Sequence, residues 1–347
     1  MAVVPPAAPV PPRLRHLATL ALVVLLFVPT SCSKDSPPAP IVVPDTPTCT
    51  KPPSGRVDAH TPESAVADWS PPVRLGDAIN SPCPGDACEI SRDGGTLYYM
   101  FTTDLTDSLP GDQRLARPNG TYAAACLGGP ADFDTPRFYD LGQGVASSLD
   151  AAPSFTADGG TVYFHSARDA NTGLHLDPPT LDILDLYVAP VSNGVPGVGV
   201  NLGQPVNSGA LDGEPAIHPD GVTLYFGSTR SGSTHIWSSV RSGSTWSAPV
   251  MLPWPVNSAA TDNQPAFTAD GDTLYFISTR DAAVGSAIYR VHRDSPAGPW
   301  SGPELVMRGV VGEPSLTADG RTLYFVHVLT DGNGVFDSDV WYSTRVP

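Results

Sequence analysis

Acidic and basic side chains recur at matching places in this chain. Acidic or amide residues stand in "DAAP", "DGEP", "DNQP" and "GEP", and an arginine ends the segments "SAR", "STR" and "STR" that follow the first three. Paired carboxylates can hydrolyse glycosidic bonds, a ring of carboxylates can bind a cation or a basic segment, and Arg–Asp pairs can fasten loops. The candidate residues are Asp150, Asp212, Asp262, Glu214, Gln264, Glu313, Arg168, Arg230 and Arg280.

The segments that carry these residues belong to a unit that occurs five times around an Asp-Gly pair. Successive copies start about 50 to 65 residues apart, which indicates a repeat architecture whose extra length lies in loops. The copies are "CEISRDGGTLYYMF" (88–101), "PSFTADGGTVYFHS" (153–166), "PAIHPDGVTLYFGS" (215–228), "PAFTADGDTLYFIS" (265–278) and "PSLTADGRTLYFVH" (314–327).

Each copy predicts a β-hairpin, because Asp-Gly favours a tight turn and "TLYF" is rich in strand-forming residues. Neighbouring rings such as Tyr225 and Phe226 would lie on opposite faces of their strand, so both faces need cover from adjacent copies. Alternating segments at 235–241 and 287–293, followed by 245–258 and 299–309, predict two further strands per copy. Four antiparallel strands per unit are typical of a β-propeller blade.

The two ends of the repeat region complement each other. Residues 68–82 match a fourth strand without the preceding three, and "DVWYSTRVP" at the C-terminus matches a third strand without a fourth. Together they would complete the last blade and close the ring, which removes exposed sheet edges. The sequence therefore predicts an all-β fold over residues 67–347, a propeller of five four-stranded blades, with six blades as the alternative.

The repeat "PAFTADGDTLYFISTR" resembles that of TolB-like, WD-repeat-like bacterial β-propellers, over most of residues 68–347. The resemblance implies the propeller fold and a role as an interaction platform, although a fold does not carry a function by itself. The best-known members of that family have six blades, so the count of five departs from them.

The N-terminus predicts export. Arg13 and Arg15 precede the apolar stretch 17–28, and "PTSC" leads to Cys32. This pattern is typical of a secretory signal, and the cysteine after small residues resembles a bacterial lipobox, with Pro29 and Thr30 departing from its usual residues. The resemblance implies a signal peptide at 1–31, lipidation of Cys32, and sorting to the outer membrane, with ordinary secretion as the alternative. The Pro-rich segment 32–66 is predicted to be a disordered tether.

Composition excludes several classes of partner. The formal net charge of −16 provides no basic surface for nucleic acid or for anionic lipid, so membrane attachment would rest on the lipid at Cys32. No motif predicts a cofactor, and the histidines show no spacing typical of a metal site. Export to an oxidising compartment makes the remaining cysteines disulfide candidates, with the pairing left open: Cys49, Cys83, Cys88 and Cys126.

The candidate acidic and basic residues are expected to surround one mouth of the central channel, because innermost strands converge on the propeller axis. In one interpretation each arginine pairs with an aspartate and fastens loops; in the other, the acidic ring binds a cation or a basic partner. The first and fifth copies have Thr103 and Val328 in place of the arginine, and the first carries an insertion at 103–120 that is predicted to overhang this face.

Two functions follow from these interpretations. The favoured one is a non-catalytic, envelope-anchored lipoprotein that presents a binding face to an envelope protein or glycan. The alternative is a propeller glycoside hydrolase that uses axial carboxylates from the same set. Catalytic acids normally differ from blade to blade, whereas these residues follow the repeat consensus, and this favours binding over catalysis.

Overall fold

The computed structural model describes residues 61–81, 83–101, 120–141, 150–168, 171, 184–330 and 335–347. The chain divides into two units, Met1–Thr30 and Ser31–Pro347, and all described residues belong to the second. The predicted signal peptide, Cys32, Cys49, Thr103 and almost all of the 103–120 insertion lie outside these residues. Within the described ranges, no helix is long and apolar enough to cross a membrane.

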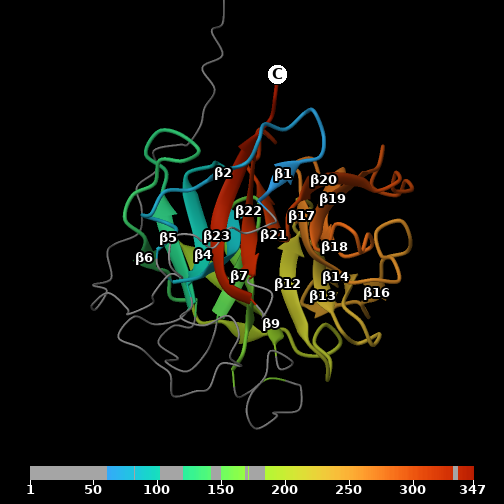
Figure 1. The fold of residues 1–347 in the computed structure, drawn as a ribbon. Coiled ribbons are helices and arrows are strands. Elements are labelled where there is room, and N and C mark those ends of the chain that lie inside the picture. Colours follow the sequence, from blue (N-terminus) through green and yellow to red (C-terminus); the bar gives the residue numbers. More distant parts are fainter. Residues whose placement is uncertain are drawn as a thin grey trace, which may run out of the picture. The chain divides into compact units, whose positions relative to one another are not determined.

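The described residues form five antiparallel sheets, named blades 1 to 5 (Figure 1). Blade 1 contains β3 (Gly85–Ile90), β4 (Thr96–Phe101), β5 (Gly120–Ala125) and β6 (Arg137–Phe138). Blade 2 contains β7 (Asp150–Phe155), β8 (Thr161–Ser166), β9 (Asp185–Ser192), β10 (Val195–Pro196) and β11 (Val200–Asn201). Blade 3 contains β12 (Asp212–Ile217), β13 (Thr223–Ser228), β14 (His235–Ser242), β15 (Thr245–Trp246) and β16 (Val250–Met251).

The last two blades each include a strand from the N-terminal side of the chain. Blade 4 contains β17 (Asp262–Phe267), β18 (Thr273–Ser278), β19 (Ala287–His292), β20 (Glu304–Arg308) and β1 (Glu63–Ser64). Blade 5 contains β21 (Val311–Leu316), β22 (Thr322–Thr330), β23 (Val335–Thr344) and β2 (Val73–Arg74). The first strand of each repeat is innermost, and the contacts β3–β7, β7–β12, β12–β17, β17–β21 and β21–β3 close a ring. The structure is a five-bladed β-propeller, so the prediction of five blades is confirmed.

The Asp-Gly turns are held by side-chain hydrogen bonds. In blade 4 the Thr268 hydroxyl donates to Asp270 Oδ1 (2.6 Å), and the same oxygen accepts the backbone N–H of Asp272 (3.0 Å). These bonds lower the pKa of Asp270. Gly271 has a φ of +76°, in the left-handed region that glycine adopts without a Cβ clash. The same arrangement recurs in blades 2 and 5, so turn chemistry at a fixed place sets each hairpin.

The paired aromatic residues join neighbouring blades. Tyr275 is 1% exposed and packs in a cluster with Val311 of blade 5, whereas Phe276, 0% exposed, packs in a cluster with Tyr225 of blade 3. Consecutive side chains of a strand point to opposite faces, so each "YF" pair fills two different interfaces. Burying each such ring stabilises the fold by about 1.5–3 kcal/mol. A single copy leaves both rings exposed, which is why the unit must repeat.

The two ends of the repeat region close the ring in the predicted way. Strand β2 pairs antiparallel with β23, with Val73 opposite Tyr342 and Arg74 opposite Trp341. An isolated bridge between Trp69 and Arg345 extends this contact. Hydrogen bonds between distant parts of the chain therefore complete blade 5 and protect its edge.

An additional strand was not expected from the sequence. Strand β1 lies within the segment 32–66 that was predicted as a tether, and it pairs with β20, Glu63 opposite Arg308. Just after it, the Asp68 carboxylate accepts hydrogen bonds from Arg290 of blade 4 (2.7 Å) and from Arg345 (2.8 Å). The folded part of the chain therefore begins before residue 67, and this segment ties blade 4 to blade 5.

In each of three blades a buried asparagine holds the exit loop through hydrogen bonds. Asn80 Nδ2 donates to the carbonyl oxygens of Leu75 and Val340 (2.9 Å each), and Asn80 Oδ1 accepts the N–H of Val340 (2.7 Å). Asn207 and Asn257 hold β9 and β14 through the same kind of paired contact. The recurring "NS" dipeptide was the sequence signal for this contact.

The Asn80→Ala variant is expected to lower the free energy of unfolding by about 2–4 kcal/mol, because three hydrogen bonds of a buried amide are lost. Since Asn80 joins residues 260 apart, hydrogen exchange should also accelerate in both β2 and β23. The control is Asn257→Ala, which loses three equivalent bonds inside blade 3. Equal rates of hydrogen exchange in β2 and β23 in the two variants would contradict a special role of Asn80 in closing the propeller ring.

The cysteines only partly follow the prediction. Cys83 and Cys126 are disulfide-bonded, whereas Cys88 is a free, buried thiol. The disulfide prediction for Cys88 is therefore wrong. Cys88 lies in the innermost strand β3, where its Sγ contacts the backbone carbonyl oxygen of Glu313 (3.3 Å). Burial raises the pKa of the Cys88 thiol well above its ordinary value, which keeps it protonated and unreactive.

Candidate functional site

All five innermost strands carry a β-bulge at their third residue. The register shifts at this point in every innermost hairpin. The third residues have positive φ values: Ala87 (48°), Ala152 (51°), Glu214 (50°), Gln264 (54°) and Glu313 (53°). This conformation costs roughly 1–2 kcal/mol for a residue with a Cβ. A bulge redirects a side chain, and here the third residues line a cavity between the strands.

The propeller axis holds two small cavities that share residues. One, of about 30 Å³, is lined by the third residues and the prolines that follow them. The other, of about 50 Å³, lies nearer the Asp-Gly turns, and both are lined by Glu89, Pro215 and Pro265. At roughly 10–15 Å³ per water, they have room for a few waters or a small group, not for a sugar chain.

Three polar side chains of the axis form a connected set. Gln264 Nε2 donates to Glu313 Oε1, and Gln264 Oε1 accepts the backbone N–H of Glu313 (3.0 Å). The Glu214 carboxyl lies close enough to the Glu313 carboxyl for each to affect the pKa of the other. Two carboxyls this close repel each other when both are ionised, so a proton on one of them stabilises the pair.

Burial and mutual repulsion keep these carboxyls protonated. Burial, and to a lesser extent the charge of the nearby Asp86, raises the pKa of Glu214 to about 8. Burial followed by the charge of Glu214 raises the pKa of Glu313 well above its ordinary value. Burial also raises the pKa of Asp86. Carboxyls that share a narrow space, with no cationic partner among the described residues, cannot all ionise, so Glu214 keeps its proton at neutral pH.

His165 borders this set but does not form an ion pair with it. Its Nδ1 accepts the backbone N–H of Glu214 (3.3 Å) and lies 3.8 Å from Glu214 Oε1. Burial lowers the pKa of His165 to about 4, so the ring is neutral in the range where Glu214 is protonated. The contact is therefore one between neutral groups.

The predicted aspartates and arginines form ion pairs within their own blades. The pairs are Arg168–Asp150 (3.0 Å), Arg230–Asp212 (2.5 Å) and Arg280–Asp262 (2.7 Å). All three aspartates are buried, and none of the six residues lines an axial cavity. The pairs lie between the first and second strands of their blades. That these residues surround the channel mouth stays a prediction. Loop fastening, the first interpretation, describes their contacts.

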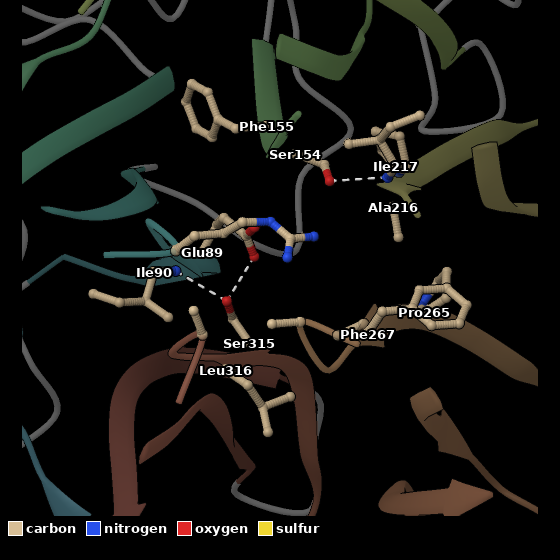
Figure 2. A pocket seen from close by; sticks show the side chains of 15 residues that line it. Glu89, Ile90, Ser154, Phe155, Ala216, Ile217, Pro265, Phe267, Ser315 and Leu316 are labelled. Atoms are coloured by element: carbon tan, nitrogen blue, oxygen red, sulfur yellow. Dashed lines mark hydrogen bonds between the residues drawn. The ribbon is translucent and has the colours of Figure 1, made fainter. Parts of the chain in front are cut away.

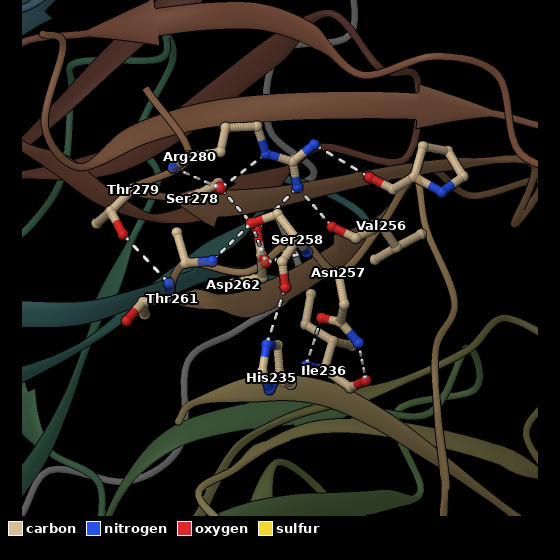
Figure 3. Close-up of polar contacts among 12 residues, drawn as sticks. His235, Ile236, Val256, Asn257, Ser258, Thr261, Asp262, Ser278, Thr279 and Arg280 are labelled. Carbon is tan, nitrogen blue, oxygen red and sulfur yellow. Dashed lines mark hydrogen bonds and ion pairs between the residues drawn. The ribbon is translucent and has the colours of Figure 1, made fainter. Parts of the chain in front are cut away.

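The blade 4 pair shows how completely such an aspartate is used (Figure 3). Asp262 Oδ2 accepts the backbone N–H (2.5 Å) and the hydroxyl (2.8 Å) of Ser258. Asp262 Oδ1 accepts the hydroxyl of Ser278 (2.6 Å) and Nη2 of Arg280 (2.7 Å). Arg280 also donates to the carbonyl oxygen of Pro255 (3.0 Å). The carboxylate is saturated with donors, so it fastens the exit loop and has no capacity left for a ligand.

The sequence located part of the axial site. Glu214, Gln264 and Glu313 meet at the axis as expected. Asp86 and Glu89 in β3 were missed, because the first copy departs from the consensus and has "GDACEI" where others have "DGEPAI". Aligning the copies on the bulge would have placed Glu89 with Ser154 and Ser315. In the fifth copy the residue at the arginine position is Leu329 rather than Val328, and both lie inside the longer strand β22.

No family model matches the sequence, and no curated protein matches it. Solved structures do. TolB from Acinetobacter baumannii is 14% identical over 78% of this chain and 56% of its own, with a TM-score of 0.43. An endo-1,4-beta-xylanase from Bacteroides thetaiotaomicron is 12% identical over 76% of this chain and 95% of its own, with a TM-score of 0.47. A thermostable family-43 glycoside hydrolase is 15% identical over 79% of this chain and 93% of its own, with a TM-score of 0.50.

These likenesses concern the fold. The chain spans just over half of the Acinetobacter TolB, and identities this low transfer no substrate or partner. TolB structures are among the matches, as the repeat predicted. The chain is thus a five-bladed β-propeller, a fold that it shares with the family-43 glycoside hydrolase.

Proposed function

We propose that this chain is a non-catalytic, envelope-anchored β-propeller lipoprotein that binds an envelope protein or a glycan. The observation that carries the proposal is the saturation of the recurring aspartates. Each of Asp150, Asp212 and Asp262 is buried and paired with an arginine of its own blade. These residues stabilise a rigid face, and a rigid face suits binding.

Trp254 is the strongest anchor that this face offers. Its side chain is 68% exposed, and the Arg280 guanidinium lies 5.8 Å from its ring centroid, beside the Arg280–Asp262 pair. Tryptophan is enriched among the residues that dominate binding energy, because it is large, rigid and amphipathic. We infer that the partner contacts Trp254 on the face of the ion pairs.

The space around the axial carboxyls does not favour the alternative function, a glycoside hydrolase. Retaining glycosidases separate their two carboxyls by about 5–5.5 Å and inverting ones by about 6.5–9.5 Å, so that a sugar or water fits between. Glu214 and Glu313 instead line a cavity of only about 30 Å³, which is too small for a sugar ring. Asp150, Asp212 and Asp262 are occupied by arginines. This arrangement favours binding over hydrolysis.

Envelope anchoring rests on the N-terminal pattern alone. Export through residues 1–31 and lipidation at Cys32 would place the propeller at the cell envelope, and outer-membrane sorting remains part of the proposal. A Cys32→Ser variant should lose incorporation of labelled fatty acid and should leave the membrane fraction. Unchanged labelling would contradict the anchor without affecting the binding proposal.

The Trp254→Ala variant is expected to weaken partner capture at least about tenfold without lowering the melting temperature, because an exposed anchor is lost and no core contact changes. The measurement compares crosslinked partners and bound glycans from envelope extract, with the full-length chain as bait. The matched control is Leu127→Ala, which removes another exposed apolar side chain, 54% exposed, in blade 1. Turnover of a polysaccharide panel that Glu214→Gln abolishes would replace the binding proposal with the hydrolase.

A further inference from the structure

The second axial cavity, of about 50 Å³, has polar groups with unused hydrogen-bonding capacity. It lies between the last residues of the innermost strands and the Asp-Gly turns, and most of its wall is proline, alanine and phenylalanine. Its polar lining residues are Glu89, Arg92, Ser154 and Ser315 (Figure 2). Apolar walls with a few convergent polar groups are typical of ligand sites.

Two of these groups can donate hydrogen bonds into the cavity. Ser154 is 9% exposed; its Oγ accepts the backbone N–H of Ile217 (3.1 Å), and its own O–H donates to no residue within the described chain. The half-buried Arg92 guanidinium makes no hydrogen bond or ion pair with any described residue, although its backbone carbonyl accepts the N–H of Ala318. The buried Ser154 hydroxyl loses solvation unless a ligand supplies an acceptor, and the half-buried Arg92 guanidinium has N–H donors left for the same ligand.

Glu89 supplies a third group. Its Oε2 accepts the hydroxyl of Ser315 (2.6 Å), and Ser315 Oγ in turn accepts the N–H of Ile90 (2.9 Å). This chain of bonds fixes one carboxyl oxygen and leaves Oε1 without a donor among the described residues. A proton on Oε1 would make Glu89 a donor toward the cavity.

The sign of the local charge decides which ligand fits. Burial raises the pKa of Glu89 to about 7, while Ser315 and Arg92 act in the opposite direction. The other titratable groups near it are Tyr98, Cys88, Asp86 and Glu313, all with raised pKa values. The raised pKa values favour the neutral forms of these groups, and Arg92 is the cation of the cavity lining. The cavity therefore favours an anion.

We propose that this cavity binds a carboxylate group, held by the Arg92 guanidinium, the Ser154 hydroxyl and the carboxyl of Glu89. A guanidinium matches the two oxygens of a carboxylate, and hydrogen bonds to charged groups are the strong ones. The volume admits the carboxylate with a short apolar stem. The carboxylate belongs to a small free acid or to the C-terminus of a peptide, and the experiment separates these sources. The carboxylate site does not include Trp254. Partner binding through Trp254 and carboxylate binding in the cavity can therefore be disproved separately.

Binding is tested by titrating the full-length chain with acetate, with propionate, and with a tripeptide as the free acid and as its C-terminal amide. At least one of the acids is expected to bind, and the amide is expected not to bind. Tighter binding of the peptide acid than of propionate assigns the site to C-termini, and the reverse assigns it to small acids. Equal binding of the amide, preferential binding of methylamine or Mg²⁺, or no acid binding to the folded protein would overturn the proposal.

The variants test two of the three donors, Arg92 and Glu89, separately. Arg92→Gln should weaken acid binding at least about tenfold. Arg92→Lys keeps the charge but loses the two parallel N–H donors of the guanidinium, so its affinity should lie between those of the wild type and Arg92→Gln. From pH 6 to pH 8, wild-type affinity should fall about tenfold as Glu89 loses its proton, whereas Glu89→Gln should bind independently of pH. Arg308→Gln, at an exposed arginine of β20, is the control. Unchanged affinity in folded Arg92→Gln and Arg92→Lys would refute the assignment.

Discussion

Replacing Asp262 with alanine is expected to lower the free energy of unfolding by about 3–5 kcal/mol, the range for removing one partner of a buried ion pair. Asp262 is 0% exposed and accepts four hydrogen bonds, from Ser258 (two), Ser278 and Arg280. The variant leaves the Arg280 guanidinium largely buried without its counter-charge. Three more donors lose their acceptor at the same place.

Urea denaturation with matched m-values measures this loss. The control is Asp281→Ala, an exposed aspartate on the loop that follows Arg280, which should change the free energy of unfolding by less than about 0.5 kcal/mol. Asp262→Asn should be intermediate, since an amide still accepts but no longer balances the charge. A double variant with Arg280→Met should lose less than the sum of the single losses. A loss below about 1 kcal/mol for Asp262→Ala would show that the pair does not fasten the loop.

Raising the pH from about 6.5 to about 8 is expected to destabilise the protein, by about 1.4 kcal/mol per pH unit for each extra proton that the native state holds. The pKa of Glu214 is raised from 4.5 to about 8, and that of Glu89 from 4.5 to about 7. Between the ordinary pKa of 4.5 and the raised pKa of each group, the native state binds more protons than the unfolded chain. Stability from these groups therefore falls as the pH rises, and Glu313 acts with the same sign.

His165 opposes this trend only at lower pH. Its pKa is lowered from 6.5 to about 4, so between these values the unfolded chain binds the extra proton and stability rises with pH. Below pH 6.5 the histidine and the carboxyls partly cancel. Above pH 6.5 only the carboxyls of the axis titrate. The fall should therefore be steepest from about pH 6.5 to about pH 7, and it should become shallower towards pH 8 as Glu89 and then Glu214 lose their native protons.

Urea midpoints across this pH range test the expectation. Glu214→Gln keeps an acceptor for the Glu313 carboxyl but removes one titrating group, so the slope should decrease by about one proton. Glu63→Gln, an exposed glutamate of β1, is the matched control and should keep the wild-type slope. Stability that is constant or rises over this range, or an unchanged slope in Glu214→Gln, would show that the axial carboxyls are ionised in the native state.

The sequence by itself determined the architecture. The Asp-Gly turn acts locally and recurs, so it predicts the hairpins. Adjacent rings such as Tyr275 and Phe276 point to opposite faces of a strand, so they predict that neighbouring blades pack against both faces. The unmatched strands at the two ends likewise predicted the closure of blade 5 through β2 and β23. Local periodicity carries this information because a blade is built from consecutive residues.

Tertiary structure alone decided which side chains meet at the axis. Glu89 and Ser315 are in hydrogen-bond contact although they are 226 residues apart, and Glu214 reaches Glu313 across two blades. The bulge at the third residue recurs in every copy, but the distances between side chains of different blades are set by the convergence of the five strands, and the repeat does not contain them. The consensus aspartates looked equally suited to chemistry, yet packing between the first and second strands placed Asp262 against Arg280 and not in the lining of the axial cavities. Burial and distance between remote residues exist only in the folded chain.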